Sequence, residues 1–377
     1  MGLNSNRDSW VYGFSQQQVL ANAQKMTETY NSQVELFTEK QNTYGTVKVE
    51  DIITSNPTLI KWSSSLIPQV ARKVHGRFSC EYLRMAMYRP FCKQNLYQSP
   101  LFIHRMGNWE QLFPTPQTKN LVICVSGIGV TKEFSAIITD TVPDLELIGK
   151  SQCFPLYYYQ LVEHDQLNLF DRTSEDYIRR DGVSDFILER AKMLNPKITK
   201  EDIFYYVYGL LHSPEYRKRF SADLKKSLPH IPFPETYQLF KAFSKAGREL
   251  AQLHLNYETG EICGEVIVTG TESSNFHVSK MRFVAKDDKR TIVFNESIRI
   301  ENIPLLSYDY VLNGKSAIEW VMERYAITIN PESKIANDPN QWSENPRYIL
   351  ELLLRIIQMS LNTMTIVTKL PPLNLLP

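Results

Sequence analysis

This chain of 377 residues has no large excess of charge of either sign. It contains 42 Lys and Arg residues and 41 Asp and Glu residues, so its net charge is only +1. This balance excludes a protein coated uniformly in positive charge, although a phosphate-binding site needs only a local basic patch. Long hydrophobic runs are also missing: they are interrupted within about ten residues, whereas a bilayer-spanning helix needs roughly 20. The N-terminus has no signal-peptide character, so we expect a cytoplasmic location.

Cysteine is scarce as well. The five cysteines are odd in number, widely spaced and mostly inside apolar strings, which is typical of reduced thiols in a core and not of a disulfide framework. No two cysteines have zinc-ligand spacing, and the seven histidines include no pair at i, i+4, so we expect no metal site. We interpret His212 and His254, which fall on helical stripes, as core or boundary residues.

Glycine motifs that could bind a nucleotide are incomplete. A phosphate-binding loop needs a glycine five positions before its second glycine, and the GKS triplets at residues 149–151 and 314–316 have Asp144 and Asp309 there instead. The GxG in residues 125–130 lacks a third glycine, and no D/N-P-P-Y/F tetrapeptide, the loop of amino-methyltransferases, occurs. We interpret these glycine motifs as turns and expect no methyl transfer by this chain alone.

Asp144, Glu146 and Lys150 suggest a metal-dependent nuclease, whose chemistry uses two carboxylates on Mg²⁺ and a lysine near the attacking water. In such sites the lysine lies two positions after the second carboxylate on the same strand face. Lys150 lies four positions after Glu146, beyond a glycine, so the spacing disfavours this alternative.

Apolar periodicity predicts helices in three parts of the chain. Near the N-terminus, Ser15 begins a glutamine-rich candidate to about residue 40, and residues 57–74 are a second candidate. In the middle, Thr199 is an N-cap with an acidic first turn, and Pro214 begins the next helix. The helix that begins after Thr199 is predicted to end near residue 212, and the one that begins at Pro214 near residue 228. The remaining predicted helices span residues 235–255, 315–325 and 346–369. The apolar stripe of the 235–255 helix is Leu239, Phe243, Ala246, Leu250 and Leu253.

Strands are predicted on both sides of the central helices, where β-branched and aromatic residues gather between turn residues. Residues 121–140 indicate two strands joined by a turn that contains glycine. Residues 153–161 indicate a third, with Pro155 favouring an edge or an early position, and residues 261–303 indicate several short ones. The pattern predicts an α+β fold: a helical N-terminal unit, a mixed or antiparallel sheet domain braced by helices, and a long C-terminal helix. The expected segments are 1–75 helical, 76–165 strand-rich, 166–257 helical, 258–312 strand-rich and 313–377 helical, with 370–377 as a loose tail.

Two local patches of basic charge are present. Residues 72–93 contain six basic residues against one acid, and residues 280–290 contain five against two. DNA sequence is read by arginine or lysine on guanine and by asparagine or glutamine on adenine, while other basic groups hold phosphates. The candidate DNA-binding residues are Arg84, Arg89, Lys93, Arg105, Lys132, Asn275, His277, Lys280 and Arg282. Lys280 and Arg282 would share one face of a strand because they are two residues apart. Solvated surface faces are the alternative interpretation of both patches.

Three blocks of the sequence carry a family resemblance. Residues 120–160, 202–257 and 310–342 resemble the C-terminal specificity region of type ISP restriction-modification enzymes. RDSWVYGFS at residues 7–15 resembles the start of the coupler that joins the methyltransferase to that region. The resemblance implies that residues 1–75 are a coupler and residues 76–377 a target-recognition domain for double-stranded DNA.

The resemblance also implies which activities lie outside this chain. Adenine methylation and ATP-dependent cleavage would belong to other modules of the same or a companion chain, together with S-adenosylmethionine, ATP and Mg²⁺. We therefore expect no cofactor and no catalysis in this chain by itself. A nuclease or other DNA-processing enzyme remains one alternative, and a protein-interaction scaffold, favoured by the near-neutral charge, remains another.

Overall fold

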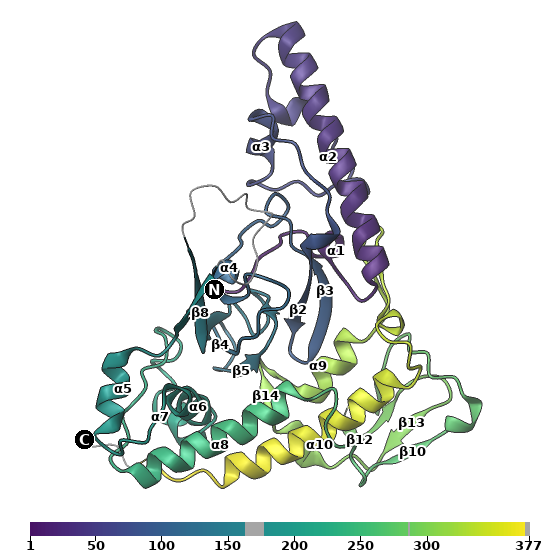
Figure 1. Cartoon of the computed structure of the whole chain (residues 1–377). Coiled ribbons are helices and arrows are strands. Elements are labelled where there is room, and N and C mark those ends of the chain that lie inside the picture. Colours follow the sequence, from purple (N-terminus) through teal and green to yellow (C-terminus); the bar gives the residue numbers. More distant parts are fainter. Residues whose placement is uncertain (163–176, 286, 374–377) are drawn as a thin grey trace.

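The computed structural model describes residues 1–162, 177–285 and 287–373. Its helices and predominantly antiparallel sheets confirm the α+β prediction (Figure 1). The helix α2 (Gln16–Tyr44) projects from one side of the molecule, while α8 (Tyr237–Leu255) and α10 (Tyr348–Thr368) run along the other. The strands of residues 83–139 (β2–β5) lie between the protruding helix and this helical base, and those of residues 267–301 (β10–β13) lie beside α10.

The N-terminal residues form part of the first sheet. Its strands, in the order β1-β3-β2-β6, are β1 (Tyr12–Gly13), β3 (Cys92–Tyr97), β2 (Leu83–Arg89) and β6 (Val142–Pro143). After the short helix α1 (Asp8–Val11), Tyr12 lies opposite Leu96, so the beginning of the chain is paired with a strand some 80 residues away in sequence. Ser15 then caps α2 by accepting a hydrogen bond from the Gln18 amide, as predicted.

A second sheet has the strand order β5-β4-β7. Its antiparallel strands are β4 (Val122–Val125), β5 (Ala136–Thr139) and β7 (Gln152–Pro155). They confirm the predicted strand pair, and Pro155 lies in the edge strand β7. The predicted third strand is divided at Leu156, because this residue is buried against the helices and the chain then leaves the sheet. It continues as β8 (Tyr157–Leu161), which pairs with β9 (Tyr177–Asp181).

The central helices are α5 (Asp185–Lys192), α6 (Lys200–Leu211), α7 (Pro214–Arg219) and α8. Thr199 and Asp202 form a capping box at the start of α6, and Pro214 occupies the first turn of α7, as predicted. The helices α6 and α8 cross at Gly209 and Gly247. A Cβ atom on Gly247 would lie 1.9 Å from the Tyr205 carbonyl oxygen, so only glycine allows this approach.

The predicted strands of residues 261–303 form an antiparallel sheet with the order β10-β13-β12-β11. Its strands are β10 (Ile267–Thr269), β11 (Arg282–Ala285), β12 (Asp288–Val293) and β13 (Arg299–Glu301). The chain then forms a hairpin of β14 (Val311–Leu312) and β15 (Lys315–Ser316), which leads into the helix α9 (Ala317–Arg324). A second hairpin, of β16 (Thr328–Ile329) and β17 (Ala336–Asn337), precedes α10.

Within the described residues, α10 is the one helix long and apolar enough to cross a bilayer, and 56% of its most apolar window is buried inside the protein. It packs against α8 and α9. These contacts are those of a core helix.

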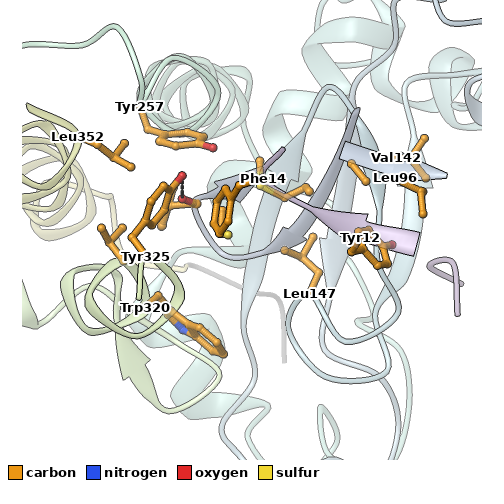
Figure 2. Packing of buried hydrophobic residues seen from close by; sticks show 14 of the residues in the cluster. Tyr12, Phe14, Leu96, Val142, Leu147, Tyr257, Trp320, Tyr325 and Leu352 are labelled. Carbon is orange, nitrogen blue, oxygen red and sulfur yellow. Dashed lines mark hydrogen bonds between the residues drawn. The ribbon is translucent and has the colours of Figure 1, made fainter. Parts of the chain in front are cut away.

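The buried apolar residues form two clusters. The larger one joins the N-terminal segment and first sheet to the β10–β13 sheet, α9 and α10. Figure 2 shows Phe14, from the N-terminal segment, facing Tyr325, which follows α9, and their ring centres are 5.3 Å apart. The smaller cluster joins β4 and β5 to the central helices. The core therefore connects residues at both ends of the chain.

Two predicted helices are wrong in extent. Residues 57–74 contain only α3 (Ile67–Ala71), because the preceding backbone is used elsewhere: the Lys61 carbonyl oxygen accepts a hydrogen bond from the buried Arg7 side chain at 3.2 Å. The helix α7 ends at Arg219 and not near residue 228, since Phe220 leaves helical geometry and turns follow. Of the predicted loose tail, residues 374–377 lie outside the described part of the chain.

Candidate nucleic-acid interface

The exposed face of the β10–β13 sheet carries two arginines in one row. Arg282 on β11 lies opposite Val293 on β12, and Val293 lies opposite Arg299 on β13. Arg282 and Arg299 are exposed, whereas Ile292 and Ile300, one residue along these strands, are buried on the other face. Since neighbouring strands are about 4.8 Å apart, the two arginines start about 10 Å apart on the same face.

Lys280 extends this basic row along the chain direction. It lies two residues before β11 and is exposed, while Met281 between Lys280 and Arg282 is buried. The two residues do not share a strand as predicted, because Lys280 precedes β11, but both are exposed on either side of the buried Met281. Within the described residues, neither these two cations nor Arg299 has an ion-pair partner. Their charged groups are therefore available to an external anion or base edge.

The loop before β11 is held in place by side-chain amides. Asn340 accepts a hydrogen bond from the Val278 amide and donates one to the Val278 carbonyl, both at 2.9 Å. Asn295 donates to the carbonyl oxygens of Asn275 at 2.8 Å and His277 at 3.1 Å. Asn275 and His277 are exposed. The loop thus presents two predicted site residues beside the basic row on a backbone fixed by hydrogen bonds.

Arg89, from the first basic patch, is buried in an internal network. Its guanidinium lies 2.7 Å from the Asp144 carboxylate and 3.8 Å from that of Asp8, and its side chain is only 14% exposed. The Tyr12 hydroxyl donates to the other Asp144 oxygen at 3.0 Å. Burial raises the pKa of Asp144 to about 6, against the opposing effect of Arg89. Arg89 therefore has a structural role as the cation that accompanies a buried carboxylate.

Two other members of the first patch, Lys93 and Arg84, are also engaged within the protein. The Lys93 ammonium lies 2.8 Å from a Glu258 carboxylate oxygen, and the residue is buried. The Arg84 guanidinium donates to the Leu83 carbonyl oxygen at 3.0 Å. Arg105 and Lys132, by contrast, are exposed. Contact of Arg84, Arg89 and Lys93 with DNA stays a prediction, and the exposed candidates fit it better.

The contacts of Asp144 leave little room for a catalytic metal. One oxygen accepts from Arg89 and from the Glu146 amide at 2.8 Å, and the other accepts from Tyr12. Among the described residues there is no group of three or more His, Cys, Asp or Glu that could hold a metal ion. Gly149 and Lys150 have positive φ, as in a tight bend, and Asn313 and Gly314, also with positive φ, form the turn that joins β14 to β15 (Lys315–Ser316).

Arg299 is the exposed basic residue of this face that was not predicted. Its sequence signal is the alternation of residues 298–301, where Arg299 stands between two isoleucines and so points away from the core. Only the pairing of β13 with β12 places it in register with Arg282.

The model of the type ISP C-terminal specificity domain matches residues 1–352. The chain therefore belongs to the type ISP C-terminal specificity domain family. A search of the curated proteins gives no match.

Three solved structures, each a complex with DNA or a DNA mimic, resemble the chain over at least 98% of its length. The type ISP enzyme LlaBIII bound to DNA is 36% identical with a TM-score of 0.87, and the alignment covers 100% of this chain and 23% of that one. A nuclease-deletion mutant of the type ISP enzyme LlaGI, in complex with a DNA substrate mimic, is 36% identical with a TM-score of 0.86, covering 100% and 33%. A DrdV–DNA complex is 25% identical with a TM-score of 0.82, covering 98% and 35%. This chain thus spans between about a quarter and about a third of the length of these proteins.

Proposed function

We propose that this chain recognises a specific sequence in double-stranded DNA as the specificity part of a type ISP restriction-modification enzyme. The observation that carries the proposal is the exposed, unpaired row of Arg282 and Arg299, with Lys280, beside the loop that presents Asn275 and His277. Arginine reads guanine through two parallel hydrogen bonds, and asparagine reads adenine in the same way. The DNA complexes of LlaBIII, LlaGI and DrdV support the assignment.

The chemistry would reside in other modules of the same or a companion chain. Adenine methylation and ATP-dependent cleavage, with S-adenosylmethionine, ATP and Mg²⁺, are assigned to these modules and not to this chain. The engagement of both Asp144 oxygens supports this division. A restriction-modification enzyme acts on DNA inside the cell, so a cytoplasmic location is part of the proposal.

Selection of bound duplexes from a randomised library, followed by sequencing, tests the function. Enrichment of one short site is expected, and a flat distribution would exclude sequence recognition. Cleavage of DNA by the pure chain with Mg²⁺, lost in Asp144→Asn, would favour the nuclease alternative. Binding that is absent at every salt concentration would favour a protein-interaction scaffold, because neutralised phosphates make DNA affinity fall steeply with salt.

Arg282→Ala tests the base-reading row directly. We expect the variant to relax the preference at one base pair by about 1 to 3 kcal/mol, because a bidentate contact to one base would be lost. The same library selection measures this change, with the exposed Arg72→Ala as control. An equal loss of affinity for every sequence would make Arg282 a phosphate contact instead.

A further inference from the structure

The loop between β4 and β5 gathers exposed lysines from three separate segments. The Gly127 amide donates to the Gly149 carbonyl oxygen at 2.9 Å, next to Lys150. The Gly129 amide donates to the carbonyl oxygen of Lys225, which follows α7, at 3.3 Å. The loop also carries its own lysine, Lys132. One stretch of six residues thus contacts or contains three lysines that lie far apart in sequence.

Glycines make these approaches possible. A Cβ atom on Gly127 would lie 2.2 Å from the Lys150 carbonyl oxygen, a distance that no side chain permits. A Cβ atom on Gly314, in the neighbouring turn, would lie 3.0 Å from the Cδ atom of Lys132. The aliphatic part of Lys132 therefore lies against this glycine turn. These three segments and the neighbouring turn at Gly314 form one surface, here termed the lysine-loop surface: residues 127–132, 149–150, 225 and 314.

The lysines of this surface are not used inside the protein. Lys132, Lys150 and Lys225 are exposed, and none has an ion-pair partner in the described ranges of the chain. Other lysines of the molecule do have such partners, as shown by Lys93 with Glu258 at 2.8 Å and Lys289 with Glu319 at 2.9 Å. Unpaired cations on segments that contact one another favour binding of an anion.

A partly buried arginine lies behind the loop. The guanidinium carbon of Arg217, on α7, lies 5.8 Å from the ring centre of Phe134, close to the end of the loop. Its Nε atom donates to the Leu211 carbonyl oxygen at 2.7 Å, whereas its Nη2 atom is buried and has no hydrogen-bond partner among the described residues. The charge of this arginine, opposed by Glu133 in the loop, therefore reaches the surface only partly compensated.

We propose that the lysine-loop surface binds the phosphodiester backbone of duplex DNA, with Lys132, Lys150 and Lys225 each neutralising a phosphate. The inference rests on the proposed function and adds to it a second contact, separate from the base-reading row. Duplex DNA carries one phosphate per 3.4 Å on each strand, so several phosphates fall within the span of a six-residue loop. Lysine ammonium groups are compact point charges with rotatable donors, which suits contacts to phosphate oxygens.

The test compares two triple variants of the whole chain that have equal net charge. One is Lys132→Gln/Lys150→Gln/Lys225→Gln, and the control is Lys48→Gln/Lys241→Gln/Lys369→Gln, which changes exposed lysines on other elements. Affinity is measured between low and moderate salt for two duplexes, one enriched from the randomised library and one scrambled. We expect the first variant to lose about 2 to 3 units of the slope of log K against log salt and on the order of 100-fold in affinity, equally for both duplexes.

The outcomes separate this inference from the proposed function. If the wild-type chain binds the enriched duplex and both triple variants have its salt slope, the lysine-loop surface is not the phosphate site, while sequence recognition stands. If the first variant loses selectivity between the duplexes and keeps its slope, the lysines read bases and the phosphate assignment is wrong. If the wild-type chain binds neither duplex, the proposed function and this inference both fail.

Discussion

Among single residues, Arg89 is a basic side chain that is held in an internal ion pair. Its ion pair with Asp144 at 2.7 Å is mostly buried, so removing the arginine leaves a carboxylate without its cation in a poorly solvated place. We expect Arg89→Gln to lower the free energy of unfolding by about 3 kcal/mol at pH 7. The loss should be smaller at pH 5, because the Asp144 carboxyl, with a pKa of about 6, can then take up a proton.

Urea unfolding at both pH values measures the effect of Arg89→Gln. The control is Arg282→Ala, whose exposed side chain should change stability by less than about 0.5 kcal/mol. If the two variants are equally stable, the network around Asp144 does not hold the fold together, and Arg89 is again a candidate for contact with DNA.

His254 is a buried histidine whose lowered pKa makes the stability of the fold depend on pH. Its Nδ1 atom lies 2.6 Å from the Tyr208 hydroxyl and its Nε2 atom 3.0 Å from the Thr363 hydroxyl, so a neutral ring can satisfy both contacts with one nitrogen accepting and the other donating. Burial lowers the pKa of His254 to about 3. Between about pH 3 and 6.5 the unfolded chain therefore binds a proton that the folded chain does not, so stability falls as the pH is lowered.

From pH 7 to pH 5 this histidine should cost about 2 kcal/mol of stability. We expect His254→Gln, although less stable at pH 7, to show a pH dependence smaller by that amount in urea unfolding. The exposed His75→Gln is the matched control and should follow the wild type. An unchanged pH dependence in His254→Gln would mean that the ring can be protonated in the folded chain.

The helices show which local rules can be read from sequence. The caps at Ser15 and Thr199 and the start at Pro214 were predicted correctly, because a cap depends on residues within one turn. The apolar stripe of α8 was predicted less well: Phe243 and Leu250 are buried, but Leu239 and Leu253 are only partly so. The buried face of α8 includes Gly247 and is therefore rotated relative to the predicted apolar stripe. The reason is that α6 packs against α8 at this glycine, which apolar periodicity does not indicate.

This contact leads to a prediction for the pair of helices. Gly247→Ala would place a methyl group against the Tyr205 carbonyl oxygen at 1.9 Å, so α6 and α8 must separate or bend. We expect a loss of about 1 to 3 kcal/mol in the free energy of unfolding, although alanine has the higher helix propensity. The comparison is Gly264→Ala, where the added methyl group meets no atom within 4 Å. A stabilised Gly247→Ala variant would contradict the close crossing.

The candidate site could be predicted only in part, for a reason of topology. Lys280 and Arg282 are neighbours in sequence, so their shared exposure followed from alternation along the chain. Arg299 entered the same row only through the pairing of β13 with β12, and the lysine-loop surface only through contacts among three distant segments. In the same way, the carboxylate partners of Arg89 and Lys93 come from other segments of the chain, which a count of charges in residues 72–93 does not include.

For the whole molecule, the core joins the N-terminal segment to the C-terminal helices. Phe14 packs against Tyr325, with ring centres 5.3 Å apart, and against Trp342 at 6.1 Å. The sequence boundary at residue 75 stays a prediction, but these contacts indicate that residues 1–14 fold with the end of the chain. A cavity at Phe14 should therefore weaken distant elements as well as its own segment.

Hydrogen exchange of the Phe14→Ala variant tests this coupling. We expect the variant to lose about 3 kcal/mol or more of stability and to exchange faster in α9, some 300 residues away in sequence. Phe37→Ala is the control, because Phe37 is equally buried but lies within the protruding helix α2. That variant should speed exchange in α2 and leave α9 protected. If Phe14→Ala also leaves α9 protected, the N-terminal segment is a separate coupler, and recognition by the β10–β13 sheet would not depend on its folding.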